Sequence, residues 1–165
     1  MEKHLYFTCP TDYLEAIIDR TFEQENYFCN SLGNSIEFRC EELDEIKDLL
    51  ETKEIRKISF VFSDDNQIVS DALTGQLYSN LSGIDYFYDD LMRRQNDLRM
   101  IWELCDDRIM LLSCYLLDKV EKLRRELDFT VNQRLDIDVK IYHRNEKTFK
   151  KAHNDLFGLR HHHLN

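Results

Sequence analysis

The stretch of sequence that decides the fold is Lys57-Ile58-Ser59-Phe60-Val61-Phe62, which runs directly into Ser63-Asp64-Asp65-Asn66. The first six residues form a nearly continuous apolar run that is bounded by charge. Such a run is typical of a strand that is covered on both faces, and strands of this kind belong to parallel sheets. The stretch therefore predicts a three-layer α/β domain with a mostly parallel sheet flanked by helices.

The segments before this strand alternate between strand and helix patterns in the same way. Short β-prone runs lie at 4–8 and 27–29, and we expect the first of them to neighbour the buried strand in the sheet. Apolar residues follow a helical period after Asp12 and Glu15, which have the spacing of a capping box. They do so again over residues 41–53, which predicts an amphipathic helix.

The second half of the chain is mostly helical and contains one more strand pattern. Helical periods cover residues 67–73, 82–105 and 107–127. Residues 135–142 (LDIDVKIY) alternate strictly between apolar and polar side chains. This alternation predicts a half-exposed strand that is antiparallel or at the edge of the sheet. Asn145 is expected to cap a last helix, which Gly158 closes.

Composition excludes several classes of function. The 165 residues predict a single domain over 1–165. No two of the four glycines are close enough for a phosphate-binding loop or a dinucleotide fingerprint. The net charge of −10 argues against nucleic-acid binding, because nucleic acids are polyanions. No apolar run approaches the roughly 18 residues of a membrane span. The five cysteines form no C-x-x-C pair, which predicts reduced thiols and a cytoplasmic location.

Candidate functional residues follow the ends of the predicted strands. Ligands of parallel sheets bind beyond the carboxyl ends of the strands. Three loops in this chain occupy such positions. Their pocket candidates are Cys9, Thr11, Asp12, Ser31, Gly33, Asn34, Ser63, Asp64, Asp65 and Asn66.

The three loops, in this order, resemble the motifs of the β-class carbonic anhydrases. Members of that family have a strand ending in C-x-D-x-R, a short strand running into R-N-A-G-N, and a later strand ending in H-x-x-C. The corresponding segments of this chain are LYFTCPTDY at 5–13, NYFCNSLGN at 26–34 and ISFVFSDDN at 58–66. A long helix and a strand like that at 135–142 also match. The resemblance spans residues 5–75 and 115–145 and implies an α/β fold and a homodimer.

The departures from the family pattern concern the residues that carry its chemistry. In the family the two cysteines and the histidine bind zinc, and the Asp–Arg pair assists the metal-bound water. Cys9 stands at the first ligand position, but Ser63 and Asn66 stand at the other two, and Thr11 and Tyr13 replace the pair. Serine hydroxyls and asparagine amides are not usual zinc ligands. The resemblance therefore implies no zinc, no other cofactor and no carbonic anhydrase activity.

Several candidates have a structural interpretation beside the functional one. Cys9, between a strand and a helix start, is a reactive thiol or a buried small residue. The acidic turn Asp64-Asp65-Asn66 is either a site for a hard cation or a turn in which Asp65 or Asn66 caps the following helix. A third option is that backbone amides at the helix starts after these strands bind a small anion. Aromatic residues in the segment 78–105 form core, a ligand pocket or a subunit contact; they are Tyr78, Tyr86, Phe87, Tyr88 and Trp102.

Three hypotheses for function follow. The first is a catalytically silent β-carbonic-anhydrase-like homodimer that binds a partner protein or a small ligand. The second is an enzyme whose pocket is rebuilt around Cys9, Asp12, Asp65 and Asn66. The third is an acidic α/β interaction module unrelated to carbonic anhydrases.

Overall fold

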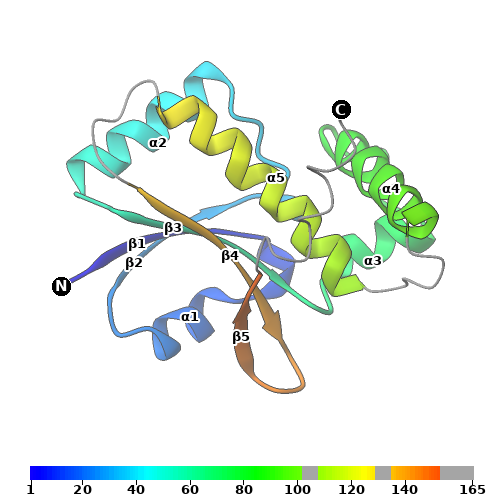
Figure 1. The fold of residues 1–165 in the computed structure, drawn as a ribbon, viewed down its shortest axis with the longest axis horizontal. Coiled ribbons are helices and arrows are strands. Elements are labelled where there is room, and N and C mark those ends of the chain that lie inside the picture. The colour runs from blue at the N-terminus through cyan, green and yellow to red at the C-terminus, as the bar shows by residue number, and fades with distance from the viewer. Residues whose placement is uncertain (102–107, 129–134, 153–165) are drawn as a thin grey trace.

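Five strands form one sheet in the computed structural model, which describes residues 1–101, 108–128 and 135–152. The order is β2-β1-β3-β4-β5; the first four strands are parallel and β5 is antiparallel to β4 (Figure 1). The strands are β1 (Lys3–Thr8), β2 (Glu25–Asn30), β3 (Lys57–Ser63), β4 (Asp136–His143) and β5 (Thr148–Lys151). The predicted α/β class with a mostly parallel sheet is confirmed.

The apolar strand β3 lies at the centre of this sheet. β3 is flanked by β1 and β4, and its residues Ile58 to Ser63 are buried. β1 and β3 are parallel neighbours, with His4 opposite Lys57 and Phe7 opposite Phe60. Both predictions for this strand are therefore confirmed.

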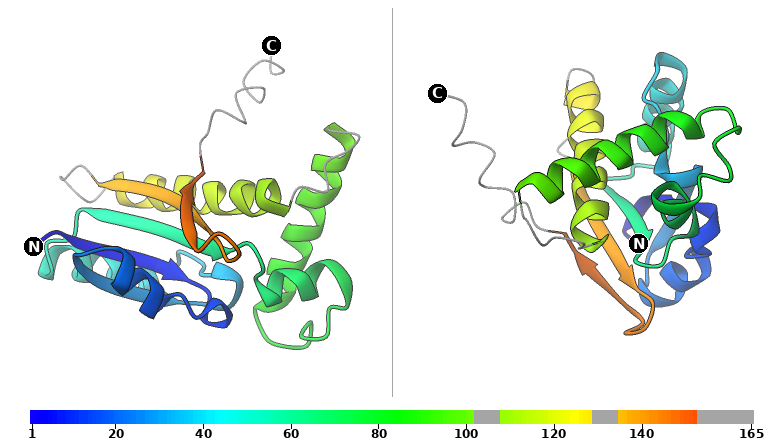
Figure 2. Two further views of the ribbon diagram at one scale, coloured as in Figure 1. Left: turned by 90° about the horizontal axis from the view of Figure 1, so that it is seen from below. Right: turned by 90° about the vertical axis from the view of Figure 1, so that its right-hand side faces the viewer.

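Helices cover the two faces of the sheet and its carboxyl end. They are α1 (Glu15–Thr21), α2 (Cys40–Thr52), α3 (Gln67–Thr74), α4 (Ile84–Ile101) and α5 (Arg108–Asp128). α2 and α5 pack on the face that carries Phe7 and Phe60, and α1 packs on the face that carries Tyr6 and Val61. Figure 2 shows α3 and α4 beyond the end of the sheet where β3 ends. Among the described residues, no helix has the length and apolar content to cross a membrane.

The prediction for the alternating strand was wrong. β4 is an interior strand, parallel to β3 from Lys57–Asp136 to Ser63–Tyr142, and the edge of the sheet is β5. Two polar residues of β4, Asp138 and Lys140, are only 15% exposed, and they bind one another and Ser59 of β3. Asp138 accepts hydrogen bonds from Ser59 Oγ and from Lys140 Nζ, the latter at 2.7 Å. Apolar and polar residues therefore alternate along a strand both when its polar side chains face solvent and when they bind other polar side chains.

The helix expected from Asn145 is also absent from the described residues. Residues 144–147 form a turn, and residues 148–151 form β5. Phe149 of β5 packs on the rings of Tyr142 and Phe22, with ring centroids 4.7 and 5.3 Å apart. This tertiary contact favours the strand over the local helical pattern. Gly158, the predicted end of that helix, lies outside the described residues.

The aromatic segment divides between core and surface. Phe87 and Tyr88 are buried, whereas Tyr78 and Tyr86 are exposed. The core interpretation therefore holds for the first pair only. Trp102 lies outside the described residues.

Candidate functional site

Three loops meet at the carboxyl end of the sheet because they follow three adjacent parallel strands. β1 leads into the 3-10 turn η1 (Pro10–Asp12), and β2 leads into the 3-10 turn η2 (Leu32–Asn34). β3 leads into the turn before α3. The structure thus brings the candidate residues of all three loops together.

Asp12 lies at the centre of this cluster and is 1% exposed. Its Oδ2 accepts a hydrogen bond of 2.9 Å from the backbone N–H of Ser63, and its Oδ1 accepts one of 2.8 Å from Asn66 Nδ2. The predicted capping box is wrong, because α1 begins at Glu15 with Leu14 in the N-cap position and no side-chain cap. Asp12 instead joins the first loop to the third.

Asn66 uses both ends of its amide within the chain. Its Oδ1 accepts a hydrogen bond of 2.8 Å from the backbone N–H of Val69, which caps α3, and its Nδ2 donates to Asp12. The cap interpretation of the acidic turn is therefore correct for Asn66. Because an asparagine at this position satisfies a helix terminus and a buried carboxylate together, its amide has no free end to offer a ligand.

Asp64 and Asp65 are held mainly by Arg144, the residue that directly follows β4. Asp65 forms an ion pair of 2.9 Å with Arg144 and accepts a hydrogen bond from Ser63 Oγ. Asp64 accepts a hydrogen bond of 3.2 Å from the backbone N–H of Arg144, and His143 Nδ1 lies 3.5 Å from it. Within the part of the chain that the structure describes, no group of three or more His, Cys, Asp and Glu residues could hold a metal ion.

Cys9 is fully buried and is enclosed by the first two loops. Its Sγ accepts a hydrogen bond of 3.2 Å from the N–H of Gly33 and lies 3.1 Å from Thr11 Oγ1. Gly33 has a φ of 63°, and a Cβ there would lie 2.8 Å from the ring of Phe87. The left-handed backbone at this position and its contact with the Phe87 ring thus require glycine.

The second loop also carries buried polar atoms without a hydrogen-bond partner. Asn34 Nδ2 donates to the carbonyl oxygen of Val61 at 2.8 Å, but Asn34 Oδ1 has no partner among the described residues. Ser31 Oγ is likewise buried without one. Asn34 therefore ties η2 to β3 through only one end of its amide.

Two arginines complete the cluster and were missed in the sequence. Arg144 donates to the carbonyl oxygen of Asp12 at 2.9 Å, in addition to its contacts with Asp64 and Asp65. Arg108 donates to the carbonyl oxygen of Asn66 and, at 2.8 Å, to Ser70 Oγ. Arg144 directly follows the carboxyl end of β4, so the same rule would have found it if that strand had been assigned as parallel.

The electrostatics of the cluster differ between its carboxylates. Burial raises the pKa of Asp12 to about 6, against the hydrogen bonds from Ser63 and Asn66 and the charge of Arg144. For Asp65, burial also raises the pKa, but the hydrogen bonds from Ser63 and Arg144 outweigh it and hold that pKa below its usual value. The proton affinity of the cluster therefore lies mainly on Asp12.

The zinc site of the carbonic anhydrase motifs does not fit these side chains. Cys9 is the one thiol among the three corresponding positions. Ser63 Oγ donates to Asp65, and both ends of the Asn66 amide are bonded within the chain. Zinc in proteins is held by a set of sulfur, imidazole or carboxylate donors, which a single thiol does not provide.

Comparisons with known proteins find similarity in structure and not in sequence. No family model matches the chain, and no curated protein matches it. The β-carbonic anhydrase CafD of Aspergillus fumigatus matches with a TM-score of 0.69 and 20% identity, over 93% of this chain and 90% of that one. CafA of the same fungus matches with a TM-score of 0.70 and 14% identity, over 92% and 75%.

A tetrameric β-carbonic anhydrase of Sordaria macrospora matches with a TM-score of 0.73 and 11% identity, over 92% of this chain and 80% of that one. These solved structures are similar to the chain over nearly all of its length. The fold that the sequence resemblance implied, a mostly parallel sheet flanked by helices, is confirmed by them.

Proposed function

We propose that this chain, which has the fold of the β-carbonic anhydrases, is catalytically silent and acts by binding a partner protein or a small ligand. The observation that carries the proposal is the bonding of Asn66, whose amide caps α3 at one end and binds Asp12 at the other. The residue at this position, which corresponds to a zinc ligand in the family motif, thus forms hydrogen bonds inside the chain.

The chemistry of carbon dioxide hydration supports the same conclusion. At neutral pH the nucleophile is a metal-bound hydroxide, which requires a bound metal ion. Cys9 alone would bind zinc weakly. At the positions of the assisting Asp–Arg pair, Thr11 carries no charge and Tyr13 is 76% exposed, with a left-handed φ of 53°.

The hypothesis of a rebuilt active site has less support. Three of its four residues, Cys9, Asp12 and Asn66, are at most 1% exposed, and each has hydrogen-bond partners inside the chain. The fourth, Asp65, is paired with Arg144. A substrate would therefore have to displace several internal contacts to reach these groups.

The first test concerns metal content and activity. Protein purified without chelator is expected to contain no stoichiometric zinc, because two of three ligand positions hold Ser63 and Asn66. It is also expected not to accelerate carbon dioxide hydration above the uncatalysed rate. Elemental analysis and stopped-flow hydration assays measure the two quantities, with an intact β-carbonic anhydrase as the positive control. Stoichiometric zinc, or hydration above background, contradicts the proposal.

We further propose that a single domain over 1–165 associates with itself, as a homodimer, in the cytoplasm. Large apolar side chains are exposed in the segment between α3 and α4, namely Leu77 and Tyr78. Exposed apolar surface of this kind favours association. The similar protein of Sordaria macrospora is tetrameric. Cys9, Cys29 and Cys40 are free thiols, as the cytoplasm favours.

Light scattering tests the homodimer. At a chain concentration of about 50 μM, the expected mass is twice the 19.9 kDa of one chain, because even weak dimers form in this range. Leu77→Ser, which removes an exposed apolar side chain without touching the core, serves as a comparison and is expected to lower this mass. A mass of 19.9 kDa for the unmodified protein contradicts self-association.

A further inference from the structure

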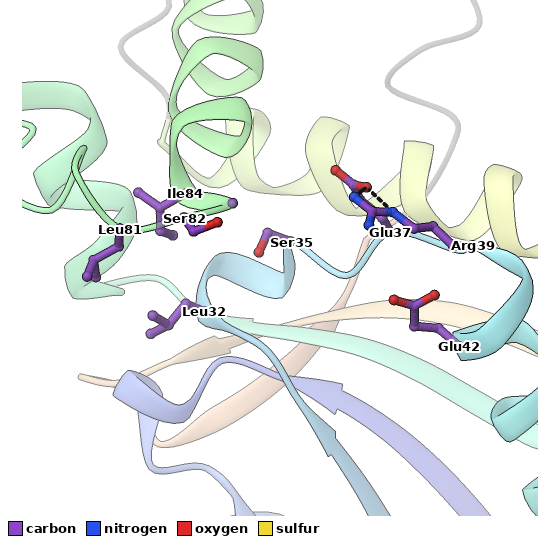
Figure 3. Close-up of a pocket in the computed structure, with 9 residues that line it drawn as sticks. Leu32, Ser35, Glu37, Arg39, Glu42, Leu81, Ser82 and Ile84 are labelled. Atoms are coloured by element: carbon purple, nitrogen blue, oxygen red, sulfur yellow. Dashed lines mark hydrogen bonds and ion pairs between the residues drawn. The ribbon is translucent and has the colours of Figure 1, made fainter.

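A groove of about 370 Å³ lies between the segment that follows η2 and the start of α4. Figure 3 shows Leu81, Ser82 and Ile84 on one side of it and Glu37, Arg39 and Glu42 on the other. Side chains that line it include Leu32, Glu37, Arg39, Glu42, Leu81 and Ile84. Apart from Leu32, which is in η2, these residues lie outside the loops of the cluster around Asp12. Its volume is in the range of small binding sites, which begins at about 300 Å³.

The two sides of the groove differ in chemistry. Leu32, Leu81 and Ile84 form an apolar side. The other side carries Glu37 and Glu42 with Arg39 as the cation between them. Arg39 Nε donates to Glu37 at 2.8 Å, so its guanidinium is engaged by one of the two carboxylates. The groove therefore holds two acidic groups and one basic group.

Glu42 is the acidic group to which Arg39 donates no hydrogen bond, although its charge, like that of Glu37, raises the pKa of Arg39. Its Oε2 is buried, and nothing in the described ranges donates a hydrogen bond to it. A buried carboxylate oxygen without a donor is unfavourable, so a donor that reaches this side chain is expected to stabilise it. Cationic N–H groups are the strongest donors for carboxylates.

The surroundings of Glu42 favour a guanidinium over a simple ammonium. Tyr86 is 70% exposed and lies close enough to Arg39 to affect the pKa of that guanidinium. Arginine stacks on aromatic rings, binds a carboxylate with two parallel N–H groups, and has an aliphatic stem that packs on apolar surface. The net charge of −10 also attracts a basic partner.

We propose that this groove binds an arginine side chain of a partner protein, with the guanidinium on Glu42 and an adjacent apolar residue of the partner against Leu81 and Ile84. The assignment rests on the proposed function, because it names the site and the kind of partner through which a binding protein acts. The arginine stem and one apolar neighbour fill a groove of this size.

The experiment compares two tripeptides, Ac-Leu-Arg-Leu-NH2 and Ac-Leu-Gln-Leu-NH2, in a titration followed by amide NMR shifts. The arginine peptide is expected to bind saturably, with a dissociation constant of about 1 mM. Its shifts should centre on residues 35–42 and 81–86. The glutamine peptide, which lacks the charge, is expected to bind at least about tenfold more weakly. Equal binding of both peptides, or no binding by either, overturns the proposal.

Glu42→Gln and Glu41→Gln form a matched pair of variants. Both remove one negative charge from the first turn of α2, but only Glu42 lines the groove. Glu42→Gln is expected to weaken binding of the arginine peptide about tenfold, and Glu41→Gln to leave it unchanged. Circular dichroism and thermal unfolding of both variants should match the unmodified protein. Equal effects of the two substitutions contradict a specific contact with Glu42.

Two further measurements distinguish this proposal from binding of a second copy of the chain and from the proposed function itself. If Glu42→Gln dissociates a dimer of the unmodified protein in light scattering, the occupant is a second copy of the chain, and the assignment to another protein is overturned. The zinc and hydration assays on the same preparation test the proposed function independently. Activity with no peptide binding contradicts both proposals, whereas inactivity with no peptide binding contradicts only this one.

Discussion

The double variant Ser63→His with Asn66→Cys is expected to bind about one zinc ion per chain, whereas the unmodified protein binds none. The substitutions place an imidazole and a second thiolate beside Cys9, which gives a set of zinc donors. The side chains are close enough for this, because Thr11 Oγ1 lies 3.1 Å from Cys9 Sγ and 3.4 Å from Asn66 Nδ2. Elemental analysis after dialysis against zinc measures the uptake.

The metal-free form of this variant is expected to be less stable than the unmodified protein. Asn66→Cys removes the cap on Val69, which is worth about 1 kcal/mol, and also removes a donor to Asp12. Zinc binding then restores stability, so the melting temperature of the variant should rise on addition of zinc. The unmodified protein should show no such rise.

Two controls make the result specific. Ser63→His alone leaves one thiol and one imidazole and should not retain zinc through dialysis. Cys9→Ser in the double variant should abolish uptake. A double variant that folds but takes up no zinc would show that the side chains at positions 9, 63 and 66 are not close enough to bind one metal ion. Little hydration activity is expected even with zinc, since Thr11 and Tyr13 remain at the positions of the assisting pair.

Asp12→Asn is expected to change the pH dependence of stability more than any other single substitution in the cluster. Burial raises the pKa of Asp12 from an ordinary 3.8 to about 6 in the folded chain. At pH values well below 3.8 the carboxyl is protonated in both the folded and the unfolded state, and the full stabilising contribution of Asp12 is present. As the pH rises through 6, the folded chain must bury a charge, and about 3 kcal/mol of stability is lost.

Urea unfolding at about pH 3 and about pH 7 measures this effect. The difference in unfolding free energy, unmodified protein minus Asp12→Asn, should decrease by about 3 kcal/mol between the two values. Asp65→Asn is the matched control, because the pKa of Asp65 is lowered and its contribution is lost as the pH falls. The difference in unfolding free energy, unmodified protein minus Asp65→Asn, should therefore increase with pH. The increase should be slight, since Asp65 is more than half exposed. A difference that does not change with pH for Asp12→Asn contradicts a buried, shifted carboxyl.

The candidate site could be located from the sequence, but its bonding could not. The rule that parallel strands present their carboxyl ends together identified Cys9, Asp12, Ser63 and Asn66 as neighbours, and the structure brings them together. Asp12 was expected to cap α1, which is a local role. It binds Ser63 and Asn66 instead, more than fifty positions away, and such a partner is invisible to local spacing.

The groove of Glu42 lay outside what the sequence could show. Glu37 and Glu42 belong to a segment rich in acids, which in the sequence is indistinguishable from a solvated helix face. The groove arises because the start of α4 packs near η2, where the ring of Phe87 lies against Gly33. Its assignment therefore depends on a tertiary contact between segments some fifty residues apart.

The sequence by itself determined the α/β class, the central strand Lys57–Ser63, the parallel pairing with β1 and most of the helices. These follow from the continuity and period of apolar residues, which are local properties of the chain. Only the tertiary structure decided that β4 is an interior parallel strand, that residues 148–151 form a strand, and that Arg144 and Arg108 join the cluster. The physical reason is that a polar side chain is compatible with burial once a partner satisfies its hydrogen bonds, and here the partners come from distant parts of the chain.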